Sequence, residues 1–344
     1  MASTRTASHA GSWYTDDADE LDAALSSWLE AVTPSSLPAP LSVCERSPTT
    51  EALPLPVTGS RAIIGPHAGY SYSGPAAAYA YRTIDTTRIS TVFILGPSHH
   101  VYLDGCAVSA CAQYDTPLGS LQIDRKITED LKATGKFSVM SLAEDEDEHS
   151  IEMHLPYVFK VFEGRDVRIV PILVGAINMS KENEYGRLLA PYLRDPSTFF
   201  VVSSDFCHWG TRFRYTHYTP SGSSVPTHLS TRSPASLFEA KPIHQSIREL
   251  DQAGILAITY PWTHDTQPKS AEHARLAFAH YLASTKNTVC GRHPIGVLLA
   301  ALAELESNGV QSECRFTRYE QSSECVRVQD SSVSYASAFV RFRE

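Results

Sequence analysis

Two apolar runs of this chain stop abruptly at histidines, and this feature most limits how the chain can fold. Residues 91–100 read TVFILGPSHH, and residues 61–70 read RAIIGPHAGY. Each run is short and is broken by Gly-Pro, as is typical of a buried strand that ends in a turn. In an open α/β sheet, ligands bind beyond the carboxyl ends of parallel strands. We therefore expect His67 and either His99 or His100 to share one cleft, and a metal site is the first hypothesis.

Two further runs, VRIVPILV at 167–174 and TFFVVSS at 198–204, are also continuously apolar. Such runs are typical of strands that helices cover on both faces. A helical pattern at 182–193 lies between them and predicts a βαβ unit. Because strands and helices alternate, we expect an α/β fold, a three-layer sandwich with a mixed, largely parallel central sheet. One domain over 1–344 is expected, with irregular insertions at about 33–60 and 219–240.

Helical spacing of apolar residues predicts the helices that cover this sheet. The acidic run EDEDEHS at 144–150 leads into an apolar stripe with i, i+3, i+4, i+7 spacing. We expect one core-facing helix there, with the acidic run as its solvated start. Other helices are expected at 14–32, 74–83, 124–134, 241–254, 270–284 and 294–308, and further strands at 106–112, 313–319 and 333–340.

Composition excludes several classes of partner. The net charge is −9 and no Lys/Arg cluster is present, which argues against nucleic acid. No apolar run approaches the roughly 20 residues that span a bilayer, and the N-terminus lacks the layout of a secretory signal. The seven cysteines form no CxxC pair and are expected to be reduced thiols. We expect a cytoplasmic protein, with the nucleus as a second compartment.

Two more segments are expected to place functional side chains at the same edge of the sheet. The run VVSSDFCHWG at 201–210 ends in Asp205 and His208, and Cys290 precedes Pro294, which suits the first turn of a helix. A thiol near a helix N-terminus with Arg292 beside it is expected to favour the thiolate. Imidazole and thiolate ligands suit iron, copper or zinc. The third ligand is either Asp205 or Cys290, and His208 is a candidate general base.

Plainer roles are expected for the neighbouring residues. We interpret His100 as structural and Cys207 as a small buried apolar residue, while Asp205 has the alternative role of capping a turn. On one continuous helix, His149 and His154 would lie about 140° apart, so they do not form an HExxH pair. The acidic run is expected to hold His149 protonated at the rim of the cleft.

Seven segments of the sequence closely resemble the Memo family, mediators of ErbB-receptor-driven cell motility. They are ASHAGSWY (7–14), PHAGY (66–70), LGPSHHV (95–101), DEDEHSIEMHLPY (145–157), VVSSDFCHWG (201–210), CGRHPIGVLL (290–299) and QDSSVSYA (329–336). The resemblance implies a fold similar to the class III extradiol, LigB-type dioxygenases. It also implies that His67, His99 and Cys290 are metal ligands for iron(II) or copper, with Asp205 and His208 as catalytic residues alongside. Cys290 resembles the family's replacement for the carboxylate ligand of the dioxygenases, so ring cleavage is not expected.

Three functions follow as hypotheses. The first is a redox metal-binding protein linked to signalling, the cytoskeleton and cell motility. The second is an oxygen-activating enzyme, a non-haem iron oxidoreductase that acts on a small-molecule ligand. The third is a binding module for a phosphotyrosine peptide or signalling protein, since Arg212, Arg214 and Arg292 flank the expected cleft.

Overall fold

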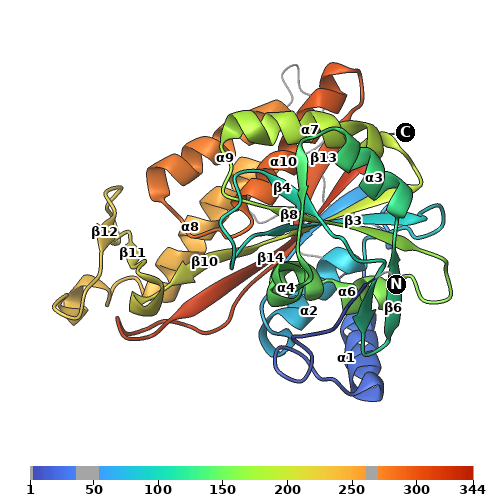
Figure 1. Ribbon diagram of the computed structural model, residues 1–344. Coiled ribbons are helices and arrows are strands. Elements are labelled where there is room, and N and C mark those ends of the chain that lie inside the picture. The colour runs from blue at the N-terminus through green and yellow to red at the C-terminus, as the bar shows by residue number, and fades with distance from the viewer. Residues whose placement is uncertain (1–2, 36–53, 261–269, 344) are drawn as a thin grey trace.

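The computed structural model describes residues 3–35, 54–260 and 270–343. Within these residues a 12-stranded sheet crosses the molecule, and helices pack on both of its faces (Figure 1). The expected α/β architecture with a mixed central sheet is therefore confirmed. Residues 36–53 of the first expected insertion lie outside the described residues.

Five neighbouring strands at the centre of the sheet are parallel. Their order is β6 (Gly119–Ile123), β8 (Arg168–Val174), β3 (Thr91–Pro97), β9 (Thr198–Ser203) and β2 (Ser60–Gly65). Helix α7 (Met179–Arg194) connects β8 to β9 as expected, but β3 lies between these two strands and pairs with both. The apolar runs are continuous because almost every residue of these central strands is buried.

Antiparallel strands extend this centre on both sides and make the sheet mixed. Beside β2 lies β14 (Ser332–Phe342), which also pairs with β13 (Ser312–Gln321) and β10 (Asp205–Trp209). Beyond β6 lie β5 (Gln113–Thr116) and the N-terminal strand β1 (Thr4–Arg5). The short strands β4 (Cys106–Val108) and β7 (Phe137–Val139) continue the sheet at the end of β8.

One face of the sheet is covered by α7 and by the three C-terminal helices (Figure 1). These are α8 (Ile243–Ile258), α9 (Ala271–Thr285) and α10 (Arg292–Ser307). Their apolar residues join one core cluster with the inward side chains of the strands, and α3 (Arg125–Ala133) contributes Leu131. In this core, Phe93 of β3 and Phe200 of β9 stack with ring centroids 4.5 Å apart. The stack fixes the register of two strands that end at the site.

The opposite face is covered by α1 (Ala18–Ala31), α2 (Tyr70–Tyr81) and α6 (Leu155–Val161). Trp28 packs so closely on Gly74 that a Cβ there would lie 2.4 Å from the indole ring. Tyr81 and Tyr157 stack at 4.5 Å, which ties α2 to α6. Two separate cores therefore hold the sheet between two helical layers.

The prediction of a single core-facing helix after the acidic run is wrong. The chain instead forms three short helices, α4 (Leu142–Asp147), α5 (His149–Glu152) and α6. The break falls at Glu148, whose backbone is extended and whose side chain accepts a hydrogen bond from the backbone N–H of Ser150. Most of the apolar stripe remains buried, because α5 and α6 each turn their apolar side inward.

The second expected insertion is largely irregular, as predicted. It contains β12 (Thr227–His228), which pairs with β11 (His217–Tyr218), and one 3-10 turn, η2 (Ala235–Leu237). Among the described helices, none combines the length and apolar character needed to cross a membrane.

Candidate metal centre

Three parallel strands end at one edge of the sheet and place candidate functional side chains there, as the sequence predicted. His67 follows β2, His99 follows β3, and Asp205 follows β9 as the first residue of β10. The turn before α10 adds Cys290 to this edge. That turn approaches β9 so closely that a Cβ on Gly291 would lie 2.2 Å from the carbonyl oxygen of Ser203. Only a residue without a side chain fits there.

His67 is the central member of the cluster and is buried. Its Nδ1 lies 2.6 Å from Oγ of Ser203, and its backbone N–H donates to Oδ1 of Asp205 at 2.9 Å. Its Nε2 lies 3.1 Å from Sγ of Cys290. Burial, and then the neighbouring histidines, lower the pKa of His67 well below its usual value. The ring is therefore neutral, which is the form that binds a metal.

His99 is held by the carboxylate of Glu148. The ring Nδ1–H donates to Oε1 at 2.9 Å, and the backbone N–H donates to Oε2 at 2.7 Å. Burial alone would raise the pKa of Glu148, but the hydrogen bonds and charge of His99 lower it to about 2. Glu148 is thus an ionised carboxylate that orients the imidazole.

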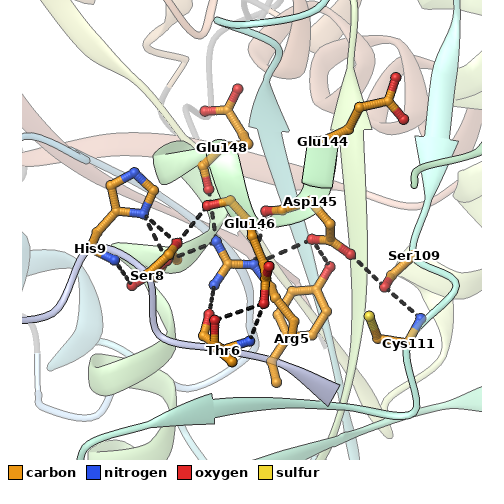
Figure 2. Close-up of polar contacts among 12 residues, drawn as sticks. Arg5, Thr6, Ser8, His9, Ser109, Cys111, Glu144, Asp145, Glu146 and Glu148 are labelled. Carbon is orange, nitrogen blue, oxygen red and sulfur yellow. Dashed lines mark hydrogen bonds and ion pairs between the residues drawn. The ribbon is translucent and has the colours of Figure 1, made fainter. Parts of the chain in front are cut away.

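The acidic run is only partly solvated, which corrects the sequence interpretation: Asp147 is exposed, but two acidic residues of the run are buried. Asp145 and Glu148 are each 2 % exposed. The buried guanidinium of Arg5, from β1, donates to the backbone carbonyls of both residues (Figure 2). Arg5 also forms an ion pair with Glu152, with Nη2 and Oε2 2.7 Å apart. The N-terminal strand therefore supports the segment that carries Glu148.

His149 lies in the cluster, which the sequence analysis did not anticipate. Its ring stacks on His99 at 4.4 Å with an interplanar angle of 17°, and Trp13 packs at 4.4 Å. The expectation that it is protonated is wrong, because burial, and then the charge of His99, lower its pKa to about 3.

The ligand atoms fall into two groups that share His67. One group is His67, His99 and His149, and the other is His67, Asp205 and Cys290; within each, the ligand atoms lie within 4.8 Å of one another. His67 and His99 both bond to other protein groups through Nδ1, as metal-ligating histidines usually do. This arrangement turns Nε2 of His67 toward Cys290. The donors in both groups suit a transition metal, but neither group contains His67, His99 and Cys290 together.

Asp205 and His208 flank the cluster. Burial raises the pKa of Asp205 to about 7, so its carboxyl group is able to hold a proton near neutral pH. The Nδ1–H of His208 donates to the backbone carbonyls of Phe206 at 2.9 Å and Thr288 at 3.1 Å. Burial lowers the pKa of His208. A neutral imidazole whose Nδ1 is occupied has only Nε2 left for a ligand.

Cys290 is not a pre-formed thiolate in the metal-free protein, contrary to expectation. Burial, and then the charge of Asp205, raise the pKa of the thiol well above its usual value. The helix N-terminus and Arg292 do not overcome this, because the thiol lies inside the cluster. Metal binding therefore has to release the thiol proton.

The cluster opens into a cleft of about 540 Å³, which we call the histidine cleft. Trp13, Tyr72 and Phe213 supply aromatic walls, and Arg212 supplies a cation. The hydroxyl-bearing wall consists of Ser322, Ser323, Ser331 and Ser332. Of the three arginines expected at the cleft, Arg212 alone lines it, while Arg292 lines a different groove.

The plainer interpretations of two neighbours are consistent with the structure. His100 is exposed, and its ring lies 5.9 Å from that of His149. Cys207 is fully buried in the core, as expected for a small apolar residue.

The fold and this cluster define an α/β protein whose sheet edge carries candidate metal-binding groups. Sequence comparison gives the family: residues 5–339 match the family of Memo-like proteins, and the chain belongs to that family. It is 47 % identical over 334 residues to Protein MEMO1 of Xenopus tropicalis, covering 96 % of this chain and 95 % of the relative. Protein MEMO1 of Homo sapiens is 46 % identical with the same coverage.

Two further comparisons give lower similarity. The memo-1 homolog of Caenorhabditis elegans is 41 % identical, covering 97 % of this chain and 81 % of the relative. An uncharacterised protein of known crystal structure from Escherichia coli K12 is 16 % identical, with a TM-score of 0.44, and covers 80 % of this chain and 99 % of that chain.

Proposed function

We propose that this protein binds iron(II) or copper through His67, His99 and Cys290 and acts as a redox metal-binding protein. One observation carries the proposal: Nε2 of His67 lies 3.1 Å from Sγ of Cys290, while Nδ1 of both histidines bonds to other protein groups. Two imidazoles and a thiolate are donors that iron and copper accept. The family resemblance implies the same three ligands.

A bound iron or copper ion would supply one-electron redox chemistry, which the side chains of the cleft do not offer. In the metal-free protein, burial raises the pKa of Asp205 to about 7, so this carboxyl group would hold a proton near neutral pH until a metal binds. His208 would accept a proton from a ligand in the cleft through Nε2, since Nδ1 is committed to backbone carbonyls. Ring cleavage is not proposed, because a thiolate at position 290 changes the charge and softness of the site.

In the cell we propose a role in signalling toward the cytoskeleton and cell motility, in the cytoplasm or nucleus. Support comes from membership of the Memo-like family and from 46 % identity to human Protein MEMO1 across nearly the whole of both chains.

Metal content tests the proposed site. Protein purified without an affinity tag or chelators is analysed for metal per chain, before and after anaerobic loading with Fe(II) or Cu(I). We expect near-stoichiometric iron or copper in the wild type and a clear loss in His99→Ala and Cys290→Ser. His100→Ala and Cys111→Ser are the matched controls and should keep their metal. Full metal content in His99→Ala and Cys290→Ser would overturn the assignment.

A second function is favoured by one observation, the presence of Arg212 beside a wall of serine hydroxyls in the histidine cleft. Arginine and hydroxyl groups bind phosphate well, so the cleft also suits a phosphotyrosine peptide of a signalling partner. Calorimetric titration with one peptide in phosphorylated and unphosphorylated form tests this. Equal affinity for the two forms, or undiminished affinity in Arg212→Gln, would remove it.

Oxygen activation on a small-molecule ligand would require the same metal. Fe(II)-loaded protein in an oxygen electrode, with a panel of aromatic and aliphatic substrates, distinguishes an oxidoreductase from a metal-binding protein. Substrate-dependent oxygen uptake that Cys290→Ser loses and Cys111→Ser retains would establish an enzyme.

A further inference from the structure

A second cavity lies behind the turn that carries Cys290. It has a volume of about 510 Å³ and is bounded by α7, α9 and the first turns of α10. These helices lie on one face of the sheet (Figure 1). We call this cavity the α9 groove. It shares no lining residue with the histidine cleft.

The floor of the α9 groove is apolar. Phe278 and Leu282 lie one turn apart on α9 and both line it, together with Ile177 before α7. Gly296 of α10 adds no side chain, and a Cβ there would lie 2.5 Å from the carboxyl carbon of Glu182. Glu182 of α7 therefore packs directly against the backbone of α10 at this side of the groove.

The rim of the α9 groove is cationic. Lys286 and Arg292 both line it, both are exposed, and neither forms an ion pair within the described residues. The groove's one lining carboxylate, Glu182, is already engaged by Nδ1 of His293 at 2.8 Å. Two uncompensated cations on one groove are notable in a chain whose net charge is −9.

A third cation contributes a buried donor. Arg275 lines the groove and is only 9 % exposed. Its Nε and Nη2 donate to Glu272 at 2.7 and 2.6 Å, but its buried Nη1 has no hydrogen-bond partner. A buried donor left without an acceptor is costly, and an acceptor atom of a ligand at this end of the groove would satisfy it.

We propose that the α9 groove binds a small organic anion, a carboxylate or a phosphate monoester with an apolar part. The anionic group lies at the rim beside Lys286 and Arg292, and the apolar part lies on Phe278 and Leu282, which lead along α9 toward Arg275. Arginine and lysine favour such anions through charge-assisted hydrogen bonds, and the apolar floor adds burial that inorganic ions do not gain. This site is independent of the proposed metal and goes beyond that function.

Calorimetric titration of metal-free, full-length protein tests the proposal. The probes are phenyl phosphate, phenylacetate, benzyl alcohol and inorganic phosphate, at an ionic strength of about 0.15 M. We expect saturable binding of at least one aromatic anion, at least about tenfold weaker binding of inorganic phosphate, and none of benzyl alcohol. Preference between phenyl phosphate and phenylacetate identifies the anionic group. No saturable binding of either aromatic anion, or equal binding of benzyl alcohol, would overturn the proposal.

Variants locate the bound probe. Lys286→Gln combined with Arg292→Gln should lower the affinity for the probe at least about tenfold. Ala283→Glu, which adds a carboxylate to the groove from an exposed position of α9, should lower it by a similar factor. Arg82→Gln, which removes an exposed cation elsewhere, should leave affinity unchanged. Far-UV circular dichroism and melting confirm that each variant is folded. Binding lost in Arg212→Gln but kept in the groove variants would place the anion in the histidine cleft and contradict the proposal.

Discussion

The carboxylate of Glu148 accepts two hydrogen bonds from His99, one from the ring Nδ1–H at 2.9 Å and one from the backbone N–H at 2.7 Å. A third hydrogen bond to the same side chain comes from the backbone N–H of Ser150 at 2.9 Å. These contacts fix both the tautomer of His99 and the direction of its ring. The last buried member of the acidic run therefore positions a proposed metal ligand.

Replacing Glu148 should weaken metal binding. In Glu148→Gln the side chain loses its charge and one of its acceptor oxygens, so His99 is oriented less well. We expect metal affinity to fall by about 10–100-fold, as for other groups that orient ligating histidines. Competition with a chelator of known affinity measures the effect. Asp147→Asn, which alters an exposed neighbour, is the control, and equal affinity in the two variants would contradict the role given to Glu148.

Arg5 should be a major contributor to stability. Its guanidinium is fully buried, forms an ion pair with Glu152 at 2.7 Å and lies 5.2 Å from the ring centroid of Tyr114. Arg5→Met leaves the carboxylates of Asp145 and Glu152 without their partner. Breaking a buried ion pair in this way costs about 3–5 kcal/mol. Urea unfolding should show this loss, whereas Arg82→Met should change stability little.

Stability should depend on pH through Glu152. Burial alone raises its pKa, but His9, Arg5 and Tyr14 lower it from 4.5 to about 2. Because the folded pKa lies below the unfolded one, this contribution is complete above about pH 4.5 and is lost as the pH falls toward about 2. Urea unfolding across this range should be less pH-dependent in Glu152→Gln than in the wild type. Glu324→Gln, at an exposed position, is the control. If Glu152→Gln shows the same pH dependence of stability as the wild type, the folded protein does not lower the pKa of Glu152.

Gly291 should tolerate no side chain. A Cβ there would meet the carbonyl oxygen of Ser203 at 2.2 Å and the Cβ of Ser204 at 2.3 Å, so the turn would have to move and take Cys290 with it. We expect Gly291→Ala to destabilise by about 1–3 kcal/mol and also to lower metal affinity. Gly135→Ala has open space around it but a left-handed backbone, with φ +69°. Gly135→Ala should reduce stability but leave metal affinity unchanged. If Gly291→Ala also keeps its metal affinity, the close fit of Gly291 does not position Cys290.

Much of the site was predictable because it follows from strand direction. Apolar runs that end at His67, His99 and Asp205 are parallel strands, and parallel strands end at the same edge of a sheet. Cys290 was predictable as a candidate from its place before Pro294, but its high pKa was not. That pKa depends on burial against Asp205, which is 85 positions away in sequence.

The acidic segment was misinterpreted because its partners are distant. Local sequence favours a solvated helix start, and distant partners explain the burial: Arg5, which lies 140 positions before Asp145, and His99, which donates to the carboxylate of Glu148. The extended backbone at Glu148 also separates α4 from α5, so the acidic run does not continue into one helix. Short-range patterns therefore predicted the strands well and this segment poorly.

X-ray absorption of the metal-loaded protein tests the central claim most directly, because it reports the atoms bonded to the metal. The account predicts a sulfur scatterer together with imidazole nitrogens, with the sulfur lost in Cys290→Ser and kept in Cys111→Ser. A shell of nitrogen alone in the wild type would contradict it. That result would assign the metal to the group of His67, His99 and His149 instead.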